Sequence, residues 1–75
     1  MELESITTGA WLRLHMRGRL DATNAREVDA QLDEIVRAGA HHIRANMAEV
    51  DYLSSAGIRV LVRQRQLLGK LGGAF

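Results

Sequence analysis

Two adjacent serines, Ser54 and Ser55, lie in the stretch DYLSSAGIRVLV (residues 51–62), where an apolar strand end meets an apolar helical segment. A serine hydroxyl accepts a hydrogen bond from the free backbone N–H groups at the start of a helix, so capping alone explains such a pair. The same N–H groups and the helix dipole also favour an added phosphate. Gly57 lets the backbone approach closely. The pattern therefore indicates either a helix cap or a site of reversible phosphorylation.

Other candidates for catalytic or metal chemistry lack the required spacing. Ser55 has no G-x-S-x-G elbow around it, and the sequence places no His and acid to activate it as a nucleophile. The histidines match no recognised zinc spacing; they are His15, His41 and His42. No P-loop follows a strand, which argues against a nucleotide-binding domain. We therefore expect no enzyme, no metal site and no cofactor.

The composition is that of one small soluble domain. The chain has 75 residues, of which 47% are apolar and 25% charged, and its formal net charge is +1. It contains no cysteine, and no apolar run approaches the roughly 20 residues of a membrane span. The sequence therefore predicts a cytoplasmic protein that neither crosses a membrane nor binds nucleic acid directly.

The second expected helix carries several cations and no acid; they are Arg59, Arg63, Arg65 and Lys70. Binding to nucleic acid would also use aromatic side chains for stacking, and the chain has only one Trp, one Tyr and one Phe. An acidic protein partner or a solvated helix face is the favoured interpretation.

Two strands are expected at the start of the chain. Residues 3–7 and 11–17 alternate between apolar and polar side chains, and Thr8-Gly9-Ala10 between them is typical of a hairpin turn. The face of the second strand that should enter the core holds Leu12, Leu14 and Met16. Trp11 lies on the opposite face, where core packing is favoured over a partner contact. The segment 18–21 is expected to end the strand.

A helix and a third strand follow. Residues 24–38 place apolar side chains at helical spacing, with Asn24 and Glu27 positioned for a capping box and Gly39 positioned to end the helix. The next strand, residues 43–47, comes after a crossover of helix length. It is therefore expected to pair in parallel with an earlier strand.

A second helix is expected to begin near Ser55 or Ala56 and to end near Gly69. Its expected inward side chains are Ile58, Leu61, Val62 and Leu68. The sequence thus predicts an α/β fold in the order β-β-α-β-α, with a small mixed sheet covered by helices. Residues 72–75 are typical of a helix exit followed by the first residue of a new strand, so we expect that the chain is incomplete.

Four segments resemble a known family when they are taken together. They are GRLD at 18–21, the helix at 24–38, NMAEVDYLSSAGIRVLV at 46–62 and LGKLGGAF at 68–75. In this order they resemble a STAS domain of the bacterial anti-sigma factor antagonist type. The resemblance implies that residues 1–75 form a single STAS-like domain lacking its C-terminal strand and helix, about two-thirds of a typical domain of the family.

The resemblance implies a phosphorylation switch. In the family, the unphosphorylated domain binds an anti-sigma factor that is also a GHKL-type serine kinase, and this frees the sigma factor. Phosphorylation of one serine ends the binding, and a PP2C-type phosphatase restores it. The implied role is regulation of transcription through partner switching.

The family's phosphoacceptor matches Ser55, whereas Ser54 stands where many members have Asp and is a competing acceptor. The acid of the family's G-x-L-D turn matches Asp21. Arg59 stands where a small glycine is common, and it either pairs with a phosphoserine or is a solvated helix residue. The expected partner-binding residues are Asp21, Ser54, Ser55, Ala56, Gly57 and Arg59.

One alternative keeps the family and changes the function. A STAS module can work without phosphorylation, as an accessory subunit in lipid transport or as the cytosolic part of an anion transporter. Gene neighbours that encode a kinase and a phosphatase would favour the switch, and transport genes would favour this alternative.

Overall fold

The computed structural model describes residues 1–75 and contains three strands and two helices. They are β1 (Glu2–Thr8), β2 (Trp11–Leu20), α1 (Ala25–Arg37), β3 (Ile43–Leu53) and α2 (Ser55–Lys70). The α/β class and the order β-β-α-β-α confirm the prediction from the sequence.

The strands form one mixed sheet in the order β1-β2-β3. β1 and β2 are antiparallel, and Gly9 in the turn between them has a φ of 61°, a left-handed conformation that glycine adopts at little cost. β2 and β3 are parallel, with Leu14 opposite Ala45, because α1 carries the chain back to the other end of the sheet. The predicted hairpin and the predicted parallel pairing are both confirmed.

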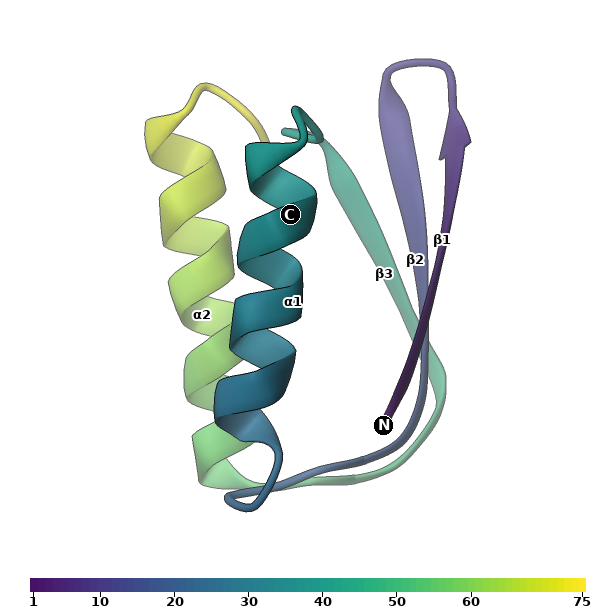
Figure 1. Ribbon diagram of the computed structural model, residues 1–75, viewed down its shortest axis with the longest axis vertical. Helices are drawn as coiled ribbons and strands as arrows, with labels where there is room; N and C mark the ends of the chain where they lie inside the picture. Colours follow the sequence, from purple (N-terminus) through teal and green to yellow (C-terminus); the bar gives the residue numbers. More distant parts are fainter.

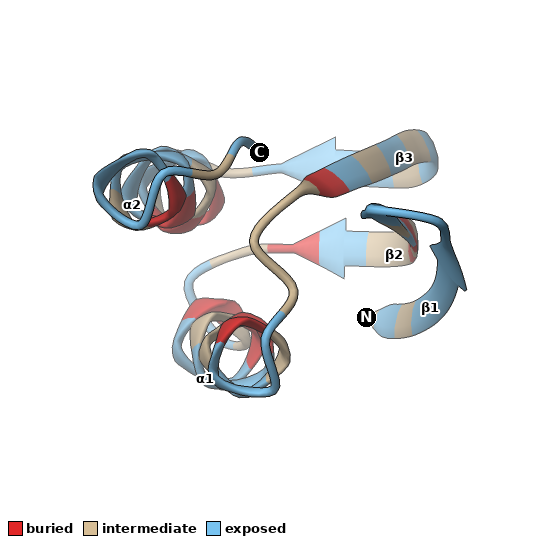
Figure 2. Cartoon of the chain, turned by 90° about the horizontal axis from the view of Figure 1, so that it is seen from above, coloured by how far each residue is buried: buried red, intermediate tan, exposed pale blue.

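Both helices lie against the same face of the sheet (Figure 1), and the view from above shows the other face uncovered (Figure 2). The core lies between the sheet and the two helices, and β2 contributes to it through the expected apolar face. The buried apolar side chains are Leu14, Met16, Leu20, Ala25, Val28, Leu32, Val36, Ile43, Val60 and Leu68. The helices therefore cover one side of the sheet only.

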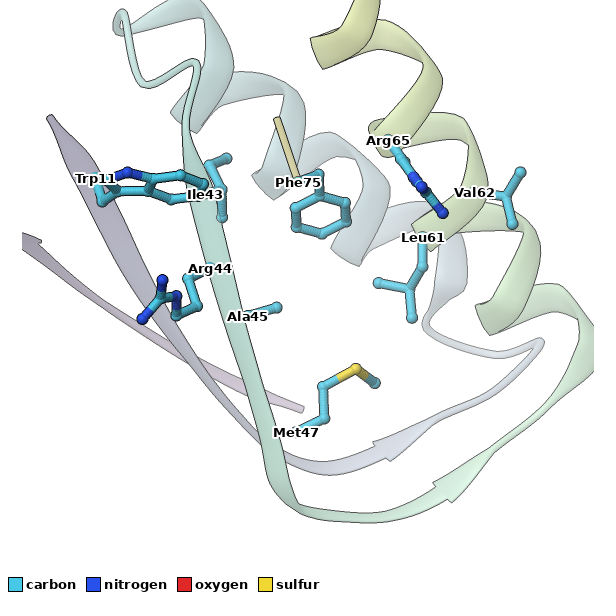
Figure 3. A pocket seen from close by; sticks show the side chains of 9 residues that line it. All are labelled: Trp11, Ile43, Arg44, Ala45, Met47, Leu61, Val62, Arg65 and Phe75. Carbon is cyan, nitrogen blue, oxygen red and sulfur yellow. The ribbon is translucent and has the colours of Figure 1, made fainter. Parts of the chain in front are cut away.

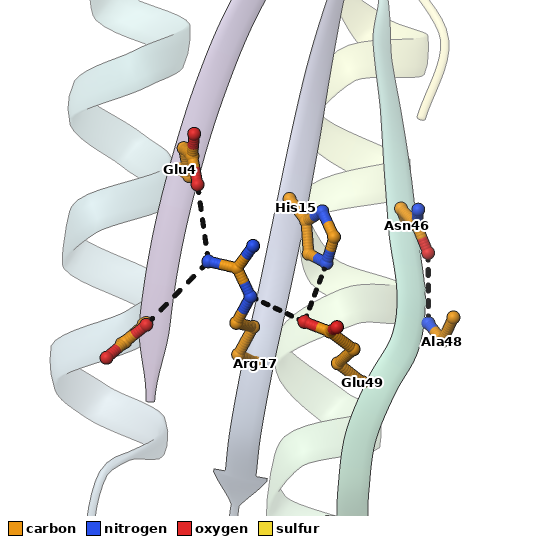
Figure 4. A network of polar contacts seen from close by, with 7 residues as sticks. Glu4, His15, Arg17, Asn46, Ala48 and Glu49 are labelled. Atoms are coloured by element: carbon orange, nitrogen blue, oxygen red, sulfur yellow. Dashed lines mark hydrogen bonds and ion pairs between the residues drawn. The ribbon is translucent and has the colours of Figure 1, made fainter.

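The uncovered face of the sheet carries ion pairs (Figure 4). The Arg17 guanidinium lies 3.2 Å from Glu4 and 2.5 Å from Glu49. His15 Nε2 lies 3.1 Å from the same Glu49 carboxylate. The hydrogen bond from Arg17 holds the pKa of Glu49 below its ordinary value. Trp11 also lies outside the core and is 38% exposed, so the prediction that it packs in the core is wrong.

β2 continues to Leu20, three residues beyond the predicted bound at residue 17, and ends within the predicted segment 18–21. Gly18 has a φ of 102°, and the register with β3 shifts between Gly18 and Arg19. The glycine thus introduces an irregularity of the bulge type, which redirects a strand without ending it. The strand end beyond it remains paired, and Leu20 is fully buried.

α1 begins without the predicted capping box, because the Asn24 side chain makes no cap hydrogen bond. Asn24 Oδ1 instead accepts the backbone N–H of Asp21 at 2.9 Å, and Nδ2 donates to the carbonyl oxygen of Arg19 at 2.6 Å. These bonds close the turn between β2 and α1. At the other end of the helix, Gly39 has a φ of 108° and its N–H bonds back to the last helical turn, as predicted.

α2 is rotated relative to its predicted orientation. Ile58 and Val62 were expected to point inward, but their side chains are 48% and 49% exposed. The buried face runs instead through Gly57, Val60, Gln64 and Leu68. The predicted inward position of Leu68 is therefore confirmed, and those of Ile58 and Val62 are wrong.

Contacts with α1 explain why a glutamine lies in the buried face. Gln64 Nε2 donates to the carboxylates of Asp29 and Asp33, each at 2.9 Å. The Arg63 guanidinium lies 2.9 Å from Asp29 and 3.1 Å from Asp33. Arg63 therefore joins the two helices while its side chain stays half exposed, so part of the predicted basic face pairs with acids of α1. The remaining exposed cations of that group are Arg59, Arg65 and Lys70.

Candidate functional site

The two serines have different environments at the start of α2. Ser54 is the N-cap residue, with an extended backbone (ψ 171°), and its Oγ accepts the N–H of Gly57 at 3.2 Å. Ser54 thereby satisfies one of the N–H groups that a helix start leaves free. The capping interpretation is thus correct for Ser54.

Ser55 is the first residue of α2, and it is exposed. Of the two serine side chains, only that of Ser54 makes a hydrogen bond, so the Ser55 hydroxyl is free. The N–H groups of Ser55 and Ala56 have no acceptor within the helix, because both precede its first internal hydrogen bond. An anion placed on Ser55 would meet these N–H groups and the positive end of the helix dipole.

The end of β2 lies directly against this helix start. The N–H of Ser54 donates to the carbonyl oxygen of Leu20 at 3.0 Å. Gly57 is buried, and a Cβ atom at this position would lie 2.7 Å from Leu20 Cγ and 3.0 Å from Leu53 Cδ1. Glycine is therefore required for α2 to approach the strand ends this closely. The contact also orients α2, since it turns the Gly57 side of the helix inward.

Asp21 follows Leu20 in the same turn. Its carboxylate accepts hydrogen bonds from the N–H of Thr23 at 3.0 Å and from the Thr23 hydroxyl at 2.5 Å. These bonds lower the pKa of Asp21, and the Arg19 guanidinium 3.6 Å away lowers it further. Asp21 is therefore ionised at neutral pH. The hydrogen bond from Ser54 to Leu20 therefore brings this turn and the serine pair together.

Exposed apolar side chains surround the helix start. Tyr52, Leu53 and Ile58 are 45%, 37% and 48% exposed. The guanidinium of Arg19 stacks on the Tyr52 ring with 4.2 Å between its carbon and the ring centroid. The sequence prediction missed this apolar surface, although Leu53 and Ile58 flank the cap at the two positions of a hydrophobic staple.

Arg59 is exposed four residues after Ser55 and thus lies on the same side of α2. No group of three or more acidic or histidine side chains is arranged to hold a metal ion. Neither helix has the length and apolar character needed to cross a membrane. The chemistry available at this end of the molecule is a free hydroxyl, an anion-compatible helix start and a fixed carboxylate.

A comparison with protein families decides the wider assignment, since the model of the STAS domain matches residues 2–75. The chain belongs to the STAS domain family. A relative in Bordetella bronchiseptica, BtrV, is named as an anti-sigma factor antagonist and is 32% identical over 60 residues. The match covers 75% of this chain and 52% of BtrV, so it spans about half the length of that relative.

Solved structures confirm the fold of this STAS domain. One match is the unphosphorylated form of SpoIIAA, which is titled an anti-sigma factor antagonist. Its TM-score is 0.76 at 20% identity, and the match covers 96% of this chain and 66% of that chain. The phosphorylated form of this Bacillus protein matches with a TM-score of 0.75, over 96% and 65%, at 20% identity. The Mglu structure matches with a TM-score of 0.79, over 95% of this chain and 18% of that chain, at 24% identity.

Proposed function

We propose that this STAS domain is an anti-sigma factor antagonist that acts by partner switching. In its unphosphorylated form it binds an anti-sigma factor that is a GHKL-type serine kinase, which leaves a sigma factor free. Phosphorylation of Ser55 breaks this complex, and a PP2C-type phosphatase restores the binding form. The domain catalyses no reaction in this cycle.

The observation that carries the proposal is the contrast between the two serines. The Ser54 hydroxyl is engaged by the N–H of Gly57, whereas the Ser55 hydroxyl is exposed and free. A kinase needs access to its acceptor, and a phosphate on Ser54 would disturb the helix cap. The similarity to BtrV and SpoIIAA supports the pathway.

The proposed release is electrostatic. A phosphate on Ser55 would add about 1.5 to 2 negative charges at neutral pH. Within the domain, the free N–H groups of the helix start stabilise this charge, and Arg59 lies one turn along on the same side. The ionised Asp21 is a second negative charge at this end. A partner surface that accepts a neutral hydroxyl would then face a strongly negative one.

The expected contact surface combines this charge with apolar area. Tyr52, Leu53 and Ile58 offer side chains that a partner can remove from water, and aromatic residues are enriched in such interfaces. A phosphate beside them would have to be desolvated in the complex. Desolvation of an unpaired charge is costly, so one phosphate suffices to weaken the complex strongly.

The proposal is tested with the purified chain, a cognate GHKL-type serine kinase, and ATP. We expect mass spectrometry to find one phosphate on Ser55, and calorimetry to find that the phosphorylated chain no longer binds the kinase. Ser54→Ala is the matched control and should still be phosphorylated, while Ser55→Ala should not.

Two results would contradict the proposal. Phosphate on Ser54, or none at all, would remove Ser55 as the acceptor and would favour a STAS module that works without phosphorylation. Equal binding before and after full phosphorylation of Ser55 would contradict the electrostatic release.

A further inference from the structure

Arg19 and Tyr52 stand opposite each other in the parallel pairing of β2 and β3, one position before Leu20 and Leu53. The carbonyl oxygen of Leu20 accepts the N–H of Ser54. The Arg19–Tyr52 pair therefore lies directly beside the start of α2, at the end of the molecule where both helices begin (Figure 1).

The Arg19 guanidinium is held in place but forms no hydrogen bond within the chain. Its carbon lies over the Tyr52 ring, 4.2 Å from the centroid. Its Nε faces Asp21 Oδ2 at 3.6 Å, which is beyond hydrogen-bond length. The main chain of Arg19 is fixed as well, because its carbonyl oxygen accepts Asn24 Nδ2. The two terminal nitrogens are thus oriented N–H donors without an acceptor.

Other arginines show what such a group binds in this chain. Arg17 donates hydrogen bonds to Glu4 and Glu49, and Arg63 donates to two carboxylates of α1. Arg19 is 61% exposed and meets one carboxylate without a hydrogen bond. A place for a second carboxylate is therefore open on Arg19, and a guanidinium offers it two parallel hydrogen bonds.

The surroundings of Arg19 favour a single carboxylate over a row of phosphates. Asp21 is ionised, and the exposed Asp51 precedes the ring that Arg19 lies over. A nucleic acid or an anionic lipid surface would bring several phosphates against these two carboxylates, and like charges repel. A protein partner brings one negative side chain, and the exposed Leu53 and Ile58 offer it apolar contact.

We propose that Arg19 binds a carboxylate of the anti-sigma factor through its two terminal nitrogens, with Tyr52 positioning the guanidinium. This contact would select a partner that carries an acid at the matching place. The inference rests on the proposed function, since it assigns a partner contact beside Ser55. It also gives release a cause, because a phosphate on Ser55 would repel a carboxylate held beside the start of α2.

The binding test uses the whole unphosphorylated chain and a cognate GHKL-type serine kinase, with calorimetry at physiological salt. Arg19→Glu should weaken binding about tenfold to a hundredfold, as expected for the loss of a charge-assisted pair. Arg65→Glu is the matched control, because Arg65 lines the groove between β3 and α2 (Figure 3), ten residues along α2 from Ser55. Its affinity should stay within about twofold of the wild type. Thermal unfolding checks that both variants fold.

A double-mutant cycle tests the role of the Tyr52 ring. Tyr52→Ala should weaken binding in the wild type by more than it does in Arg19→Gln, because only the wild type has a guanidinium for the ring to hold. Tyr52→Phe keeps the ring face and should bind like the wild type. Additive losses in the cycle would overturn the positioning role.

Arg19→Lys identifies the partner's acid directly. Lys70 is the only lysine of the chain and lies at the far end of α2, so with an acetylated N-terminus the amine at position 19 is the only one at this end. A carbodiimide joins an amine to a neighbouring carboxylate as an amide, and mass spectrometry locates the link. We expect a link from position 19 to an Asp or Glu of the kinase. A link to Asp21 alone would show that the charge is used within the chain and would overturn the proposal.

The results separate this proposal from the proposed function. A wild-type chain that does not bind the kinase would overturn both. Wild-type binding that Arg19→Glu leaves unchanged would overturn this proposal alone. Equal losses in Arg19→Glu and Arg65→Glu would assign the effect to net charge and would overturn it as well.

Discussion

The backbone N–H of Ser54 donates to the carbonyl oxygen of Leu20 at 3.0 Å, which fixes the start of α2 to the end of β2. Ser55 is the next residue. The backbone before it is bonded to Leu20, and the backbone after it is capped where the N–H of Gly57 donates to the Ser54 hydroxyl. Its position thus depends on packing rather than on a mobile loop. The stability of this end of the molecule can be tested without any partner.

Ser54→Ala should destabilise the domain by about 1 kcal/mol, because it removes the oxygen that caps the N–H of Gly57. Ser55→Ala should change stability by less than about 0.5 kcal/mol, since the Ser55 hydroxyl makes no hydrogen bond and is exposed. Urea unfolding of the two variants and the wild type measures both values. Equal destabilisation would contradict the different environments of the serines.

Gly57→Ala should destabilise the domain by about 1–3 kcal/mol, because the new Cβ would lie 2.7 Å from Leu20 Cγ and 2.9 Å from its carbonyl oxygen. Gly69→Ala is the matched control. No atom lies within 4 Å of a Cβ at that exposed helical position, so alanine should stabilise α2 by about 0.5–1 kcal/mol. Thermal unfolding of both variants checks the opposite signs, and the same sign for both would contradict this packing.

Charge at Ser55 should alter stability through the helix dipole. Ser55→Glu should stabilise the domain by about 0.3–1 kcal/mol and Ser55→Lys should destabilise it by a similar amount at low salt. Thermal unfolding at low and high ionic strength measures the effect, which should shrink as salt screens the charges. A destabilising Glu would argue against a helix start that accommodates phosphate.

Acid should weaken the contact between the two helices. Hydrogen bonds from Arg63 and Gln64 lower the pKa of Asp33 in the folded state, so the unfolded chain binds the proton more tightly. The resulting stability is complete above the unfolded pKa of about 3.9 and is lost as the pH falls through the lower folded pKa. Urea unfolding between neutral pH and pH values below this range should show the loss. Asp33→Asn should be less stable at neutral pH and should lose less on acidification, and an unchanged acid response would contradict the prediction.

Local patterns in the sequence were sufficient for the element order. The alternation in residues 11–17 and the helical spacing in residues 24–38 each survive in the fold, because one face of each element packs in the same core. The parallel pairing of β3 followed from the length of the crossover alone. Ser54 and Ser55 were singled out together because serine is among the preferred residues at a helix start.

The errors arose where long-range contacts decide between local alternatives. Gln64 is polar and was not assigned to the core, but carboxylates on α1 satisfy its amide nitrogen there. That pairing and the close approach of Gly57 rotate α2, which exposes Ile58 and Val62. Asn24 could cap a helix or close a turn, and its hydrogen bonds with the backbone of Arg19 and Asp21 favour the turn.

No helix covers the second face of the sheet, so substitutions on that face affect the surface rather than the core. Side chains such as His15 and Arg17 meet water and one another there, so replacing them changes surface charge and leaves the hydrophobic interior intact. Every second side chain of each strand thus points away from the core. A lineage can acquire new contacts on this side while the residues that make the chain fold, and those around the serines, stay the same.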